Sequence, residues 1–205
     1  MLELRSTFGF LAFHGGALER MTDRIAAEAA TCAGASLYAV VQPPGLREHL
    51  PSVEVTPDAS PRLGAFLDHV DVAVAVHGYG RDGLWSTLLL GGRNRALAGH
   101  VGTLLAAALD GHEVCTDLDA IPDGLRGIHP DNPVNRCRSA GVQLELPPGV
   151  RGLTPRWADW QGPALPPPAE AVVAALAEAA ATWPVQGASR STTQADGAPG
   201  RSTRR

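Results

Sequence analysis

The stretch VAVAV at residues 72–76, followed by His77 and Gly78, decides the fold. An unbroken apolar run of this length is typical of a β-strand that is buried on both faces. Such strands occur in parallel sheets whose two faces are covered by helices. Outward from this strand, we therefore expect helices to alternate with further strands along the chain.

The segments on both sides of this strand fit that expectation. Short apolar runs predict strands, and longer alanine-rich or leucine-rich segments that start near a capping residue predict helices. Ser60 and Thr22 are the predicted N-caps of two of these helices. The predicted strands are 8–13, 36–41, 72–76, 86–90 and 142–146, and the predicted helices are 22–32, 60–69, 94–109 and 170–181.

This alternation predicts a single α/β domain with a mixed, mainly parallel sheet flanked by helices. We expect the domain to span residues 1–185. Residues 186–205 are rich in Gly, Ser, Thr and Arg and offer almost nothing to bury, so we expect a disordered tail there.

Composition and charge exclude several classes of function. The chain has 205 residues, a formal net charge of −4 and 5% aromatic residues, so it lacks the basic and stacking surfaces of nucleic-acid-binding proteins. No apolar run approaches the roughly 20 residues that span a bilayer, and the N-terminus lacks the pattern of a signal peptide. We expect a monomer without nucleic-acid or membrane partners, cytoplasmic or released without a classical signal peptide.

The three cysteines, Cys32, Cys115 and Cys137, form no CxxC motif and no even-numbered disulfide framework. We expect reduced and mostly buried thiols. Any metal ion must therefore be held by histidine and carboxylate side chains.

Two histidines come directly after predicted strands. His14 follows strand 8–13 and precedes Gly-Gly-Ala-Leu-Glu19, and His77 follows the central strand. Because parallel strands end at the same edge of a sheet, both imidazoles are expected to point into one crevice. Glu19, expected to start the next helix, can share an ion with them, as in catalytic zinc sites of the His₂Glu type. The alternatives are a purely structural glycine turn and satisfied structural histidines.

A carboxylate is expected inside the last predicted strand. Period-2 alternation puts Gln143 and Glu145 on one face, opposite the apolar residues of the strand. A buried carboxylate needs a partner or a role, and beside a metal-bound water Glu145 would be a general base. The alternative is a solvent-exposed glutamate on an edge strand.

Two further segments offer cations. The loop 127–136 contains two prolines and two asparagines and ends on Arg136, which could bind a substrate carboxylate through two parallel hydrogen bonds. His129 in the same loop is an alternative metal ligand to His77. Arg93 and Arg95 form a second basic pair near a strand end, and their alternative role is that of solvated residues at a helix start.

Five motifs, in this order, resemble the poly-γ-glutamate hydrolase family. They are HGGALE at 14–19, VAVHGYG at 74–80, LLLGGRNRAL at 88–97, GIHPDNPVNR at 127–136 and GVQLEL at 141–146. The resemblance covers roughly residues 8–147. The family includes phage enzymes that degrade poly-γ-glutamate capsules and bacterial homologues, some of them labelled phage-related replication proteins.

The resemblance implies a fold similar to that of the zinc carboxypeptidases, with one zinc ion. It implies His14, Glu19 and His77 as zinc ligands and Glu145 as the catalytic glutamate. Asn135 and Arg136 would correspond to an Asn-Arg pair that binds substrate. Two features depart from the carboxypeptidase pattern: four residues separate the first two ligands, and the Asn-Arg pair follows the third ligand instead of preceding it.

We therefore expect a zinc-dependent hydrolase of γ-glutamyl amide bonds, whose arginines contact an anionic glutamyl polymer or peptide. One alternative keeps the zinc centre but acts as a carboxypeptidase or amidase on peptides or N-acyl amino acids. Another alternative is a non-catalytic binding protein or a phage replication-associated protein. The acidic charge argues against a replication role, and the presence of all four centre residues argues against an inactive homologue.

Overall fold

A computed structural model of the chain describes residues 1–153, 160 and 162–184, and the predicted tail at 186–205 lies outside these residues. The strands are β1 (Leu2–Glu3), β2 (Phe8–Gly16), β3 (Ser36–Gln42), β4 (Val72–Gly78), β5 (Thr87–Leu90), β6 (Glu113–Cys115) and β7 (Val142–Leu146). The α-helices are α1 (Thr22–Ala33), α2 (Pro61–His69), α3 (Arg95–Ala108) and α4 (Pro167–Thr182). Three short 3₁₀ helices are η1 (Ser52–Glu54), η2 (Asp123–Leu125) and η3 (Pro133–Arg136).

The described strands form one sheet in the order β1-β3-β2-β4-β7-β5-β6. The four central strands β3, β2, β4 and β7 are parallel to one another. At one end β1 pairs antiparallel with β3, and at the other end β5 pairs antiparallel with β7 while β6 runs parallel to β5. The expected mixed, mainly parallel α/β sheet is confirmed.

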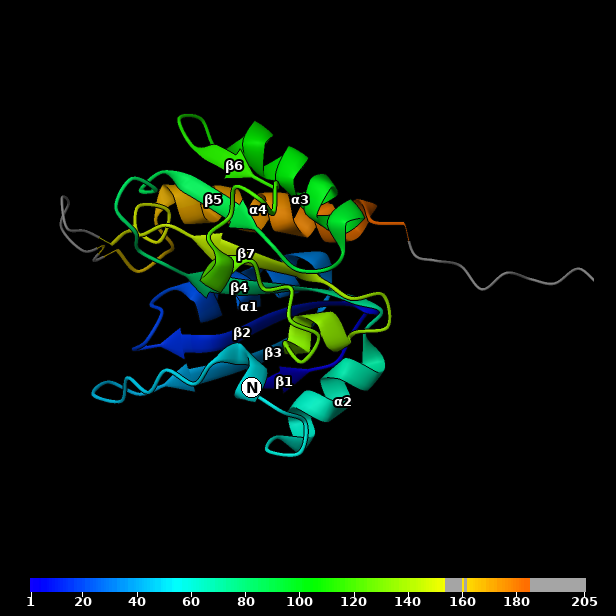
Figure 1. Cartoon of the computed structure of the whole chain (residues 1–205). Helices are drawn as coiled ribbons and strands as arrows, with labels where there is room; N and C mark the ends of the chain where they lie inside the picture. Colours follow the sequence, from blue (N-terminus) through cyan, green and yellow to red (C-terminus); the bar gives the residue numbers. More distant parts are fainter. Residues whose placement is uncertain (154–159, 161, 185–205) are drawn as a thin grey trace, which may run out of the picture.

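Helices cover both faces of this sheet (Figure 1). The larger core lies on the face of α1, α3 and α4, where it contains Phe10, Val74 and Leu144 from alternate positions of β2, β4 and β7. The other face packs against α2 and η3 through residues such as Leu11 and Ala75. Period-2 alternation thus assigns every second residue of the central strands to each core.

The predicted elements all occur, with shifts at their ends. Ser60 caps α2 as expected, because its hydroxyl accepts the N–H of Leu63 at 3.3 Å. The prediction that Thr22 caps α1 was wrong: Met21, with a φ of 77°, is the N-cap, and the Thr22 hydroxyl donates to the carbonyl of Glu19. Strands β1 and β6 were not predicted, because they are too short to show a period.

None of the helices in the described part of the chain is both long and apolar enough to cross a membrane.

Candidate metal and catalytic site

The site forms at the edge of the sheet where β2, β4 and β7 end. His14 lies in β2, His77 in β4 and Glu145 in β7. Both histidines are therefore among the last three residues of their strands, whereas the sequence placed them directly after the strands. His77 and Glu145 are register partners, and their side chains therefore point to the same face of the sheet. This is the face that α2 and η3 cover.

A β-bulge brings His14 to that face as well. Between Ala12 and Gly15, β2 contains one more residue than the part of β3 that pairs with it. Such a bulge turns a side chain that simple alternation would direct to the opposite face. As a result, the ring centroids of His14 and His77 lie 5.1 Å apart.

The turn after β2 folds Glu19 back over His14. Gly16 has a φ of 72°, and a Cβ there would lie 2.2 Å from the backbone oxygen of Gln42, so glycine is required. The N–H of Glu19 then donates to the carbonyl oxygen of His14 at 2.8 Å. The prediction that Glu19 starts the next helix was wrong, because the chain needs this turn first and α1 begins at Thr22.

The Glu19 carboxylate is shared between the two histidines. Its Oε1 lies 2.8 Å from His14 Nδ1, and its Oε2 lies 3.5 Å from His77 Nδ1. The backbone N–H of Gly78 also donates to Oε2, at 2.8 Å. Burial opposes ionisation of Glu19, but the hydrogen bonds with His14 and His77 outweigh it and hold the pKa well below its usual range. Glu19 is therefore negatively charged.

The second nitrogen of His14 fixes how the ring presents itself to Glu19. His14 Nε2 lies 2.9 Å from the carbonyl oxygen of Leu50, and a carbonyl can only accept, so Nε2 carries the hydrogen. In a neutral ring Nδ1 is then a bare acceptor that faces the Glu19 carboxylate. Two acceptors come this close only with a proton or a metal ion between them, and a backbone carbonyl behind a histidine is the usual partner in metal sites.

His77 is buried, with 3% of its surface exposed. Its Nε2 is a buried polar atom without a hydrogen-bond partner among the described residues. Burial lowers the pKa of His77. The hydrogen bond with Glu19 and the charges of Glu19 and Glu145 raise the pKa by more than burial lowers it, so the net shift is upward. Imidazole nitrogens around one carboxylate form the donor set that catalytic zinc sites use, so these residues fit a zinc ion.

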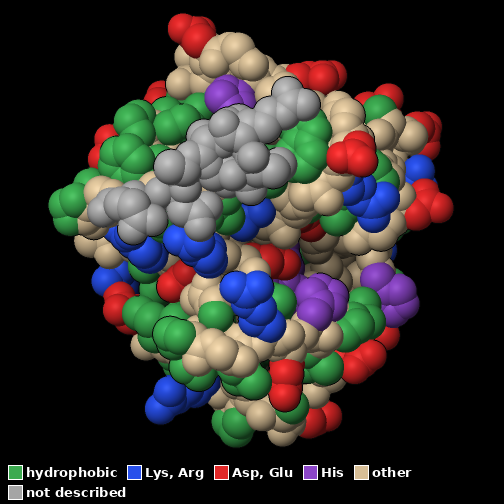
Figure 2. Space-filling model, turned by 90° about the vertical axis from the view of Figure 1, so that its left-hand side faces the viewer, with side chains coloured by type: hydrophobic (Ala, Val, Ile, Leu, Met, Phe, Trp, Pro, Cys, Tyr) green, Lys and Arg blue, Asp and Glu red, His purple; other side chains and the backbone are tan. Residues whose placement is uncertain are grey.

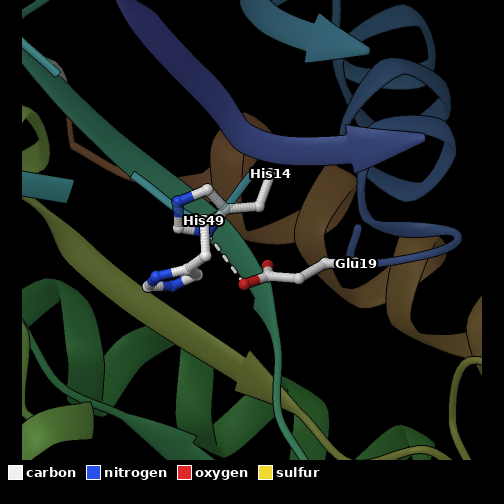
Figure 3. Close-up of side chains that lie close together, drawn as sticks. All are labelled: His14, Glu19 and His49. Carbon is white, nitrogen blue, oxygen red and sulfur yellow. Dashed lines mark hydrogen bonds and ion pairs between the residues drawn. The ribbon is translucent and has the colours of Figure 1, made fainter. Parts of the chain in front are cut away.

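His49 was missed by the sequence analysis, although it lies in the loop that follows β3, a neighbour of β2. Its ring centroid lies 4.7 Å from that of His14. Donor atoms of His14, Glu19 and His49 all lie within 4.8 Å of one another, an arrangement that could hold a metal ion (Figure 3). A histidine shortly after a parallel strand was the signal that could have found it.

His77 contacts Glu19 from outside that tight cluster, so the sequence-based triad and the tightest cluster differ in one histidine. The two histidines differ in their surroundings: His77 is buried on a central strand with an unpartnered nitrogen among the described residues, whereas His49 is exposed on a loop. His129, the alternative ligand, lies in the cavity wall and is not part of the cluster.

Glu145 is held by a chain of amide side chains. It is 3% exposed on a central strand, so the alternative of an exposed edge glutamate is wrong. Gln143 donates to its Oε1 at 2.8 Å, and Asn132 donates to Gln143 at 2.7 Å. Burial raises the pKa of Glu145, and the positive charge of His77 offsets this only in part. The result is a carboxylate that is more basic than a solvated one.

A buried arginine, also missed from the sequence, lies behind the centre. The Arg151 guanidinium donates to the carbonyl oxygens of Leu146, Arg20 and Tyr79, at 3.2, 3.2 and 3.1 Å. A Cβ at Gly78 would lie 2.5 Å from the guanidinium carbon, so the glycine after His77 makes room for this cation. Burial lowers the pKa of Arg151, while Glu19 and Glu145 raise it.

The predicted substrate-binding residues do not join this group. Because β5 runs antiparallel to β7, the segment after β5 lies at the opposite edge of the sheet, where the N–H of Asn94 donates to Gly141, just before β7. Arg95 there donates to three backbone carbonyls, and both Arg93 and Arg95 line a different cavity, which Phe8 at the start of β2 also lines. The remaining two predictions are Asn135, which ties the loop carbonyls of Gly127 and His129 together, and Arg136, which is exposed on η3.

A cavity of about 660 Å³ opens over the centre, and Glu19, His77 and Glu145 are among its lining residues. It is also lined by residues from two loops, His49 and 51–53 from one and 123–125 and 127–129 from the other. Figure 2 shows the face where the central strands end, with histidine, acidic and arginine side chains around a hollow. The arrangement can hold a cation on one side and present a basic carboxylate on the other.

Comparisons with known proteins identify a family for most of the chain. Residues 2–154 match the family model described as poly-gamma-glutamate hydrolase. Among curated proteins the sequence comparison found no match.

Two solved structures share the fold. One is a bacteriophage poly-gamma-glutamate hydrolase, with a TM-score of 0.70 and 23% identity over 87% of this chain and 86% of that chain. The other is YNDL-apo (zinc-free), with a TM-score of 0.70 and 18% identity over 87% of each chain.

Proposed function

Because the chain belongs to the poly-gamma-glutamate hydrolase family, we propose that it hydrolyses γ-glutamyl amide bonds with one zinc ion as its cofactor. A hydrolase of this family implies a glutamyl polymer as substrate. The observation that carries the zinc-dependent part is the shared carboxylate of Glu19, whose two oxygens face the ring nitrogens of His14 and His77.

In this proposal His14, Glu19 and His77 hold the zinc ion. When bound, the ion supplies a Lewis acid that lowers the pKa of water from 15.7 to about 7 in well-tuned sites. The opposed acceptors of His14 and Glu19 support a cation between them, and the buried, unpartnered Nε2 of His77 is a further free donor atom of the centre. The zinc-free state named for one neighbour of the same fold is consistent with a metal in this centre.

Glu145 is the proposed general base. Its raised pKa makes it a stronger proton acceptor than an ordinary glutamate, and it lines the same cavity as Glu19 and His77. Gln143 holds one of its oxygens in place. Glu145 would take the proton of the attacking water and then deliver it to the leaving amine nitrogen.

The polymer would lie in the cavity above the centre. We do not assign its carboxylates to Arg93 or Arg95, which lie at the other edge of the sheet. Arg136, exposed on η3 and outside the cavity wall, is proposed at most as an outer contact for a polymer that extends beyond the cavity.

Substitution of the base tests the mechanism. We expect Glu145→Gln to retain stoichiometric zinc and to lower kcat on poly-γ-glutamate at least about 100-fold, because the proton acceptor is lost. Glu178→Gln, an exposed glutamate on α4, is the matched control and should behave like the wild type. Unchanged turnover of Glu145→Gln would remove Glu145 from the role of base.

Two further measurements separate the alternatives. Metal analysis of His77→Ala should show loss of stoichiometric zinc, and full retention would contradict the ligand assignment. A panel of γ-linked and α-linked glutamyl peptides distinguishes a γ-glutamyl hydrolase from a general peptidase. Cleavage of the α-linked peptides alone would contradict the proposed linkage.

A further inference from the structure

His49 lies closer to the centre than its place on an exposed loop would suggest. Its ring centroid is 4.7 Å from that of His14, and its donor atom is within 4.8 Å of those of His14 and Glu19. It also lines the cavity through which substrate would reach the centre. Neither the five sequence motifs nor the proposed mechanism gives this histidine a role.

The loop that carries His49 is fastened on both sides of it. Before it, the Gln42 side chain forms two hydrogen bonds with the backbone of Glu48, at 2.7 and 3.0 Å. After it, the Leu50 carbonyl accepts from His14 Nε2 at 2.9 Å. The hydrogen bonds of its two neighbours therefore hold this loop against the centre, and the His49 ring itself packs against that of His14.

With His49 the centre contains four side chains that can donate to a metal ion. His14 and His77 are buried on central strands, and Glu19 is fixed by the Gly78 N–H. A catalytic zinc site uses three protein ligands and leaves one position for water or substrate, whereas four protein ligands close the site. His49, the exposed one of the four, is the ligand that can leave without disturbing the sheet.

We propose that His49 is an additional, displaceable metal ligand that occupies the substrate position of the centre until substrate enters the cavity. This inference rests on the proposed zinc site at His14, Glu19 and His77, and it adds a protein ligand to that site. The proposal gives the loop that carries His49 a chemical role. Its imidazole would increase the affinity for the metal ion in the resting enzyme and would be replaced by the substrate when substrate binds.

Metal affinity and coordination test the proposal independently of turnover. The zinc Kd is measured by competition with a chelating dye for the wild type, His49→Ala and His129→Ala, whose altered histidine lines the same cavity outside the donor cluster. We expect His49→Ala to raise the Kd about tenfold or more, since even partners behind a ligand contribute 10–100-fold, and His129→Ala to leave it unchanged. An unchanged Kd in His49→Ala would overturn the proposal.

The visible spectrum of the cobalt-substituted protein separates ligation from loop packing. We expect the cobalt absorption of the wild type to change when His49 is replaced by Ala or Gln, because the inner set of ligands changes. Adding poly-γ-glutamate to the cobalt form of Glu145→Gln should shift the spectrum in the same direction. A raised Kd with an unchanged spectrum would show that His49 acts only through the loop, and it would overturn ligation.

Failure of the zinc centre and failure of the His49 role give different binding results. If the wild type binds neither zinc nor cobalt, the zinc centre itself fails and so does this proposal. If the wild type binds zinc in a His77-dependent manner and His49→Ala binds it equally well, only the role of His49 fails.

Discussion

Strand β2 contains one more residue than its partner strand between Ala12 and Gly15, and this extra residue sets the direction of His14. Without the bulge the imidazole would point toward the helices α1, α3 and α4 and away from His77. A single glycine then completes the corner, because the positive φ of Gly16 turns the chain so that Glu19 returns to the ring. At the residue scale, the centre depends on one insertion and one backbone angle.

The buried thiol of Cys137 gives a pH prediction at the same scale. Burial raises its pKa to about 12, whereas an unfolded thiol ionises near 8.5. Rising pH therefore ionises the unfolded chain first, so stability is full below about pH 8.5 and falls as pH approaches 12. Between pH 8 and 10 we expect Cys137 to account for a loss of roughly 2 kcal/mol in the free energy of unfolding.

Urea unfolding at the two pH values measures this loss. The variant Cys137→Ala should be less stable than the wild type at pH 8 but should lose roughly 2 kcal/mol less on going to pH 10. Cys32→Ala, which removes an exposed thiol, should retain the pH dependence of the wild type. Equal losses in the wild type and Cys137→Ala would contradict the prediction.

At the scale of elements, three of the segments that carry the centre are joined by one further side chain, Arg151, in addition to their direct contacts. Its guanidinium donates hydrogen bonds to backbone carbonyls at the end of β7, in the residue after β4 and in the turn after β2. These three segments carry Glu145, His77 and Glu19. The side chain is therefore expected to position the centre as a whole, while its charge lies near the two carboxylates.

Replacing Arg151 by Met should lower the free energy of unfolding by about 3 kcal/mol, because three carbonyls lose a charged donor in a buried place. We also expect weaker zinc binding and a lower kcat, since Glu19 and Glu145 are no longer held in register. Arg62→Met, at an exposed position on α2, should stay within about 0.5 kcal/mol of the wild type. If Arg151→Met had the same stability and zinc affinity as that control, Arg151 would not position the centre.

At the scale of the whole molecule, the centre and the main core are separate. The core lies between the sheet and α1, α3 and α4, whereas the centre lies at the carboxyl edge of the central strands. We therefore expect the fold not to depend on a metal ion, unlike small domains that are unfolded without zinc. Binding at the edge can still stabilise the folded chain by mass action.

We expect zinc at about 100 times its Kd to add about 2.7 kcal/mol, which corresponds to a Tm increase of roughly 5 °C or more for a domain of this size. A chelator should reverse this increase and leave the far-ultraviolet circular dichroism at 25 °C unchanged. Thermal unfolding with and without zinc measures the shift, and His77→Ala should abolish it. Loss of the folded signal on chelation would contradict the separation of core and centre.

The sequence by itself predicted the α/β class, the five longer strands, the four helices and the family, because apolar periodicity and motif order are local properties of the chain. The expected strand ends paired His14 with His77, since parallel strands end at a common edge, and the family resemblance placed Glu19 and Glu145 with them. The short strands β1 and β6 left no detectable period. The pattern also did not separate the turn at Glu19 from the start of α1 three residues later, at Thr22.

Only the tertiary structure decided the rest, because it depends on strand direction and on contacts between distant segments. The antiparallel course of β5 moved Arg93 and Arg95 to the far edge, a fact that the residues after a strand cannot reveal. The approach of His49 depends on β3 lying beside β2, and the clamp of Arg151 on the convergence of three chain segments. Which strands pair, and in which direction, is a property of the folded chain, whereas the types of side chain that the pairing brings together can be read from the sequence.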